Sequence, residues 1–150
     1  DYVKALHAAA RAAPTRIAFR AGYDESLAHR IQAGADAFMV PSRFEPCGLT
    51  QLYALRYGTV PVVREVGGLA DTVTNASAPN LAAGRATGLV FRAATSAALL
   101  AAIRRAMALY RAKAPWQQMQ RTGMAQEHSW ADSGQAYRDL YSSLIVDRAD

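Results

Sequence analysis

Short apolar runs and longer amphipathic stretches alternate along most of this chain. Four of the apolar runs have the length and composition of buried strands, namely Ile17–Arg20, Ala37–Val40, Val60–Val63 and Gly88–Phe91. The stretches between these runs are typical of helices. Because strand–helix alternation places parallel strands in one sheet with helices against its faces, the pattern predicts an α/β, Rossmann-like fold.

The expected helices have recognisable starts and stops. Asp24 is a candidate N-cap for a helix that stops at Gly34, and Gly58 is expected to end a later one. The expected segments are helices at Tyr2–Ala13, Asp24–Ala33, Leu49–Tyr57 and Trp130–Val146, a helical turn at Leu69–Val73, a loop at Asn75–Thr87, a helix capped by Thr95 or Ser96 that reaches about Lys113, and a helix from Pro115 to about Glu127.

Length and composition fit one domain with a real core, because 51% of the 150 residues are hydrophobic. No apolar run approaches the roughly 18 residues of a membrane span, and no targeting signal is recognised at the start. Cys47 is the single cysteine, so no internal disulfide forms. These observations favour a cytoplasmic protein without membrane partners.

A net charge of +5 and a pI of about 9.7 raise the alternative of nucleic-acid binding. The arginines, however, are scattered along the chain, and Lys4 and Lys113 are its only lysines. We interpret the charge as compositional bias and expect no nucleic-acid partner. A modest positive field still helps to attract an anion such as a nucleotide sugar.

The most informative stretch runs from Pro41 to Val73. A strand leads into a loop that contains Glu45, and a helix begins soon afterwards, at Leu49 or Thr50. The next strand leads into a Gly67-Gly68 turn. Two successive strand-to-helix switches form a crevice at the carboxyl ends of parallel strands, and a helix start offers free N–H groups to an anion. The pattern therefore predicts a site for a sugar linked to a phosphate.

From about Arg16 onward, the chain resembles the C-terminal donor-binding domain of bacterial glycogen synthases and plant starch synthases, which are retaining glucosyltransferases of the two-Rossmann-domain (GT-B) type. The resemblance is densest in SRFEPCGLTQLYALRYG and GGLADTV. Many retaining GT-B enzymes carry a second glutamate eight positions after the first. Here that position is Tyr53, as in glycogen and starch synthases, which argues against sucrose- or trehalose-phosphate-type synthases.

The resemblance implies that residues 1–150 are a single nucleotide-sugar-binding domain. The whole enzyme would transfer glucose from ADP-glucose to the non-reducing end of an α-1,4-glucan, with retention and without a cofactor or metal. His7, His29 and His128 have no ligand-like spacing and are interpreted as structural.

The resemblance also assigns roles to single residues. Glu45 would hydrogen-bond the transferred glucose and support charge separation at its anomeric carbon. Taken alone, such an acid is more often an ordinary surface or capping group, and the flanking Pro-Cys-Gly-Leu-Thr favours the site. No close second acid accompanies it for a double displacement, because Asp71 is expected to cap or stabilise the turn at Leu69. Tyr23 would stack on the adenine of the donor, although it also fits an ordinary aromatic.

The remaining candidates supply backbone groups or flank the loop. Cys47 is interpreted as a small packing residue that offers its amide, with a reactive thiol as the alternative. Gly48 lets the backbone approach the sugar. The others are Leu49 and Thr50 for the distal phosphate, Ser42 beside the loop, Arg43 as a partner of Glu45 or of a phosphate, and Gly67 and Gly68 as lining of the glucose and phosphate pocket.

By resemblance, a whole acceptor domain and the first two strands of this domain precede residue 1, with an arginine–lysine pair that grips the donor phosphates. The chain is thus expected to be incomplete at its N-terminus and, by itself, an inactive or weakly nucleotide-binding fragment. The missing strands would lie between Ile17–Arg20 and Ala37–Val40. We therefore expect a homodimer or a rearranged strand pairing.

Overall fold

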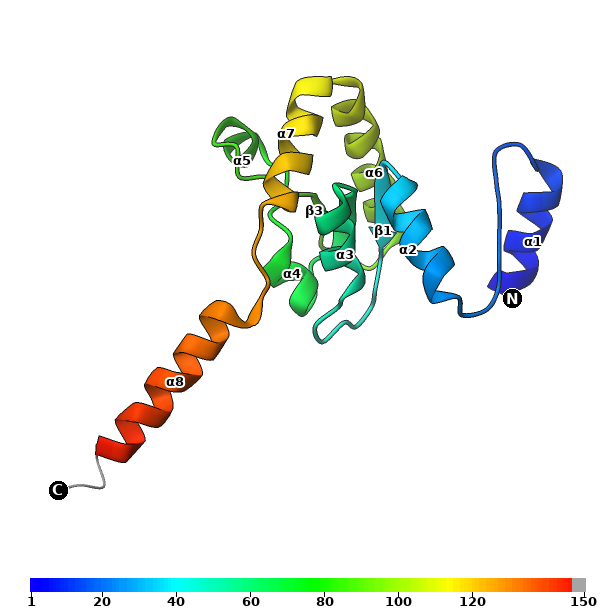
Figure 1. The fold of residues 1–150 in the computed structure, drawn as a ribbon. Coiled ribbons are helices and arrows are strands. Elements are labelled where there is room, and N and C mark those ends of the chain that lie inside the picture. The colour runs from blue at the N-terminus through cyan, green and yellow to red at the C-terminus, as the bar shows by residue number, and fades with distance from the viewer. Residues whose placement is uncertain (147–150) are drawn as a thin grey trace. The chain divides into compact units, whose positions relative to one another are not determined.

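The computed structural model describes residues 1–146 and divides the chain into two compact units, Asp1–Ile31 and Gln32–Asp150. Figure 1 shows the elements of both units along the chain. The second unit contains the sheet, the loop between Val40 and Thr50 and the loop between Arg64 and Gly68.

The first unit is formed by helix α1 (Tyr2–Ala12) and the segment that follows it. Asp1 caps α1 by accepting from the backbone N–H of Val3, at 3.2 Å. The ring of His7 meets the ring of Phe19 edge-on, with centroids 4.8 Å apart, which agrees with a structural histidine.

The prediction of a strand at Ile17–Arg20 is wrong, because no described strand pairs with this segment. A strand exists only through hydrogen bonds to a neighbour, and the apolar pattern does not supply that neighbour. Helix α2 (Glu25–Gly34) follows, and Asp24 accepts from the backbone N–H of Leu27 at its start, as expected.

The sheet of the second unit has three parallel strands in the order β1 (Ala37–Val40), β2 (Val60–Arg64) and β3 (Leu89–Phe91). Ala37 lies opposite Val60, and Val62 opposite Leu89. The predicted α/β fold class, with a parallel sheet flanked by helices, is confirmed.

Alternate residues of β2 enter different cores. Val60 and Val62 pack with Leu89, under the helices α6 (Ser96–Arg111) and α7 (Lys113–Met124), which contribute the buried residues Ala102, Ala106, Trp116 and Met119. Val63 faces the other core, with Leu69 of the short helix α4 (Gly68–Thr72) and with Val40 and Val73. Helix α3 (Thr50–Tyr57) connects β1 to β2 and packs against both strands and against α7 (Figure 1).

Most predicted helix ends are confirmed. Thr95 caps α6, Gly58 ends α3 in a left-handed conformation, and α8 spans Trp130–Val146. The prediction of a loop at Asn75–Thr87 is partly wrong, since this segment contains the short helix α5 (Ala78–Ala82). Ser77 caps this helix and Pro79 stands in its first turn, a combination that favours a helix start in a polar stretch.

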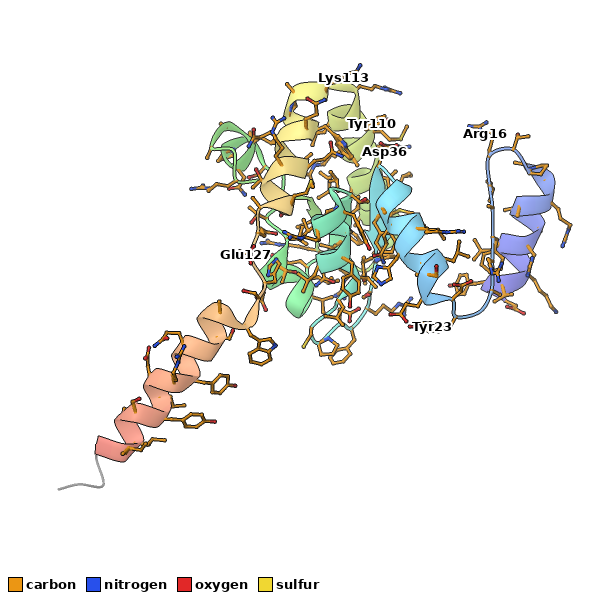
Figure 2. All side chains as sticks on the ribbon, in the orientation of Figure 1. Arg16, Tyr23, Asp36, Tyr110, Lys113 and Glu127 are labelled. Carbon is orange, nitrogen blue, oxygen red and sulfur yellow. The ribbon has the colours of Figure 1, made fainter. Side chains whose placement is uncertain are left out.

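In the part of the chain that the structure describes, strand β1 has a partner strand on one side only. Met39 is 53% exposed there, beside a cavity of about 270 Å³ between the strand and α6. Its lining includes Asp36 and Tyr110, which Figure 2 labels. The homodimer expected from an open edge stays a prediction. Among the described residues, no helix combines the length and apolar character that a membrane crossing needs.

The loops after β1 and β2 contact each other backbone to backbone. The N–H of Gly68 donates to the carbonyl of Pro46, at 3.1 Å. A Cβ on Gly67 would overlap the carbonyl oxygen of Glu45, and a Cβ on Gly68 would overlap that of Cys47. Gly67 also has φ +47°, a conformation that side chains disfavour. Only residues without a side chain permit this approach.

We expect Gly67→Ala to lower the free energy of unfolding by about 2 kcal/mol or more, because a methyl group must displace the loop at Glu45. This corresponds to a loss of roughly 4–8 °C in Tm, measurable by thermal denaturation of the 150-residue chain. Gly84→Ala is the matched control: Gly84 has φ +65°, but its Cβ would lie 3.7 Å from the nearest atom, Gln118 Nε2. Equal losses of Tm in the two variants would contradict the close-contact explanation.

Candidate functional site

The carboxylate of Glu45 is held at the carboxyl end of β1. Glu45 is half-buried, and the hydroxyl of Ser42 donates to its Oε2 at 3.1 Å. Arg43 is exposed, and neither of the two ion pairs found among the described residues includes it. Arg43 and Glu45 therefore do not form the ion pair that the sequence left open as an alternative. Ser42 thus orients the Glu45 carboxylate, and no donor among residues 1–146 bonds its Oε1, which leaves that oxygen available to a ligand.

The start of α3 presents backbone donors next to this carboxylate. The N-cap is Leu49, which makes no side-chain capping hydrogen bond. Within residues 1–146, no oxygen accepts from the backbone N–H of Gly48, Leu49 or Thr50. Gly48 has φ +72°, which turns the chain into the helix. Free N–H groups and the positive end of the helix dipole favour an anion at this point.

A buried glutamine lies beneath these donors. Gln51 is fully buried, and its side-chain amide nitrogen donates to the carbonyls of Cys47 and Gly48, at 3.1 and 2.9 Å. The same nitrogen lies 3.2 Å from Thr72 Oγ1. Sequence reasoning missed Gln51, although an amide in the first turn of a helix is well placed to bond the loop that precedes it.

Arg64 is a second residue that sequence reasoning missed. It ends β2, and its Nη1 donates to the carbonyls of Ser42 and Arg43, at 3.2 and 2.7 Å. Its Nε donates to the carbonyl of Arg92, at 3.1 Å. A charged residue directly after a buried apolar strand was the available signal. Arg64 thus fixes the start of the loop that contains Glu45.

Two candidates are placed differently from the sequence interpretation. The thiol of Cys47 is exposed, so it does not pack in a small volume, and the contacts of this residue come from its backbone carbonyl. Asp71 lies in the first turn of α4, whose N-cap is Gly67, so no side chain caps that helix. Asp71 remains able to interact with the helix dipole.

Tyr23, which Figure 2 labels, belongs to the first unit. Its side chain is 91% exposed. The other nine candidate residues lie in the second unit, in the two loops and the helix start that meet at the end of the sheet: Ser42, Arg43, Glu45, Cys47, Gly48, Leu49, Thr50, Gly67 and Gly68.

A cavity of about 340 Å³ begins at Leu49 and follows α3 past Tyr53 and Arg56. His128 belongs to its lining, so this histidine lies at a surface hollow and not within a core. No group of three or more His, Cys, Asp or Glu residues suited to a metal occurs in the described part of the chain.

Curated relatives of this chain share more than half of its residues. Glycogen synthase from Novosphingobium aromaticivorans is 54% identical over 143 residues, which cover 95% of this chain and 30% of that protein. Glycogen synthase 1 from Methylococcus capsulatus is 55% identical over 146 residues, with 97% and 30% covered. The chain thus spans about 30% of the length of these relatives.

Two solved structures resemble the fold. The catalytic domain of starch synthase IV from Arabidopsis thaliana, bound to ADP and acarbose, matches with a TM-score of 0.73 and 36% identity, over 81% of this chain and 25% of that chain. Sucrose-phosphate synthase from Thermosynechococcus elongatus matches with a TM-score of 0.64 and 25% identity, over 93% and 34%.

The family described as glycosyl transferases group 1 matches residues 4–122, which is most of the chain. A match of this extent includes both loops at the end of the sheet and the helix start between them. The chain therefore belongs to the glycosyl transferases of group 1.

Proposed function

We propose that this chain is the donor-binding part of a glycogen synthase that transfers glucose from ADP-glucose to the non-reducing end of an α-1,4-glucan, with retention of configuration. The observation that carries the proposal is that one loop presents both the oriented carboxylate of Glu45 and the free N–H groups at the start of α3. This combination suits a sugar joined to a diphosphate. The intact enzyme is the longer polypeptide that would also supply the acceptor-binding domain.

The choice of donor rests on the relatives. Several curated relatives that share 51–56% of aligned residues are named glycogen synthase. The Arabidopsis starch synthase structure is bound to ADP and to acarbose. We infer an adenine nucleotide for this chain from that likeness. Tyr53 on α3 favours a glycogen or starch synthase over other retaining enzymes of this type.

The chemistry follows from where charge develops. When the bond between the anomeric carbon and the distal phosphate breaks, positive charge grows on the sugar and negative charge on the departing ADP. The Glu45 carboxylate would stabilise the first, and the N–H groups at Gly48–Thr50 would stabilise the second. A new bond then forms from the anomeric carbon to the 4-hydroxyl oxygen of the glucan, whose proton leaves with the ADP. We propose that no metal takes part, since the helix start supplies the positive potential.

The proposed donor is tested by supplying the intact enzyme with radiolabelled ADP-glucose or UDP-glucose and a linear α-1,4-glucan. We expect label in the glucan chiefly from ADP-glucose, with release of one ADP per glucose. Label incorporated chiefly from UDP-glucose would contradict the adenine assignment, and no incorporation from either donor would contradict the proposed function.

For Glu45→Gln in the intact enzyme, we expect kcat to fall by about 10²–10³-fold, because a contact made mainly in the transition state is lost. The affinity for ADP, measured by calorimetry, should change by only a few-fold, since Glu45 would act on the glucose and not on the nucleotide. Glu65→Gln is the matched control: it removes a carboxylate at the same end of the sheet, where Glu65 pairs with Arg92. A Glu45→Gln enzyme with nearly the parent kcat would show that the assigned role is wrong.

A further inference from the structure

The side-chain amide of Gln51 contacts the loop in front of α3 at two successive peptide groups. Its nitrogen donates to the carbonyl oxygens of Cys47 and Gly48. Gln51 is completely buried, and its Oε1 has no hydrogen-bond partner among the described residues. A buried amide that leaves one of its own groups unpaired pays a desolvation cost. The same amide group nevertheless bonds two loop carbonyls, which points to a role in orienting the loop.

The direction of these carbonyls decides where the amides point. In a trans peptide, the C=O and the N–H of the next residue point in opposite directions. Since the carbonyl of Cys47 faces inward to Gln51, the N–H of Gly48 faces away from it. The carbonyl of Gly48 also faces Gln51, so the N–H of Leu49 faces away as well. Gln51 therefore turns two consecutive donors away from the interior.

Thr72 extends this arrangement to the second loop. Its hydroxyl accepts from Gln51 Nε2 at 3.2 Å, so the two N–H groups of that amide are shared among three acceptors, and it donates to the carbonyl of Gly68 at 2.6 Å. Gly68 is the residue that lies against Cys47. One chain of hydrogen bonds thus runs from the loop after β1, through Gln51 and Thr72, to the loop after β2.

Gly48 adds a steric condition to the same arrangement. A Cβ at this position would overlap Oε1 of Gln51. The amide of Gln51 therefore occupies the space that a side chain at Gly48 would need. Because Gly48 has no side chain, the Gln51 amide can lie close beneath the loop.

We propose that Gln51 and Thr72 are a positioning pair for the donor diphosphate: they hold the N–H groups of Gly48 and Leu49 toward the distal phosphate and lock the two loops in register. Neither residue touches the substrate. This inference rests on the proposed function, because it assigns the diphosphate of a nucleotide sugar to the start of α3. The inference adds two residues, Gln51 and Thr72, that act on the backbone of the site and not on the ligand.

The test compares Thr72→Val and Thr72→Ser in the intact enzyme. Thr72→Val keeps the shape of the side chain but removes the hydroxyl, whereas Thr72→Ser keeps the hydroxyl. We expect Thr72→Val to raise the Kd for ADP and the KM for ADP-glucose by about tenfold, as for one buried hydrogen-bonding group left unpaired. Thr72→Ser should recover most of that loss. Gln51→Met, of similar length but without donors, should weaken ADP binding at least as much.

Leu109→Ala is the stability control. Leu109 packs on the α6–α7 core, away from both loops, so its truncation should lower Tm and leave the Kd for ADP unchanged. The positioning role is overturned if Thr72→Val lowers Tm while its Kd for ADP stays within twofold of the parent, or if Thr72→Ser gives no recovery. The Thr72 variants decide the matter should Gln51→Met fail to fold.

Failure of the proposed function gives a different result. In that case the parent enzyme itself neither binds ADP nor makes glucan from ADP-glucose. The positioning role is then refuted together with the proposed function. An active parent whose ADP affinity is unchanged in Thr72→Val refutes the positioning pair alone.

Discussion

The approach of Gly67 and Gly68 to the backbone of Glu45–Cys47 is the constraint on which the candidate site depends. Parallel strands bring the ends of β1 and β2 to one edge of the sheet, but they do not fix how the loops beyond them meet. That is set by the absence of two side chains, since a Cβ on either glycine would overlap a carbonyl oxygen of the facing loop. The Glu45 carboxylate and the start of α3 are placed relative to each other by this contact.

Polar groups on either side of the contact complete the arrangement. Arg64 holds the carbonyls of Ser42 and Arg43, and Gln51 holds those of Cys47 and Gly48. Carbonyls are thereby engaged by the protein at both ends of the loop, while the N–H groups at the helix start remain available. A loop whose carbonyls at both ends are bonded by the protein, and whose donors at the helix start are free among the described residues, is suited to a negatively charged ligand. This agrees with membership of the glycosyl transferases of group 1 and with relatives named glycogen synthase.

The sequence predicted features that depend on local chemistry. Val60–Val63 is apolar throughout because this central strand is buried on both faces, and Thr95 and Gly58 mark helix ends through their own hydrogen bonding and backbone freedom. Features that depend on a distant partner were harder to predict. Ile17–Arg20 has a strand's composition but no partner strand among the described residues, and the Gln51–Thr72 bond joins residues 21 positions apart. The two loops of the site were anticipated from sequence, whereas the groups that hold them were not.

The most direct test of the central claim is a crystal structure of the intact enzyme with ADP bound. The account predicts that oxygens of the β-phosphate lie within hydrogen-bond distance, about 2.7–3.2 Å, of the backbone nitrogens of Gly48, Leu49 or Thr50. The Glu45 carboxylate should then face the space beyond that phosphate, where the glucose would be. A β-phosphate bound elsewhere, with those three N–H groups exposed to solvent, would contradict the account.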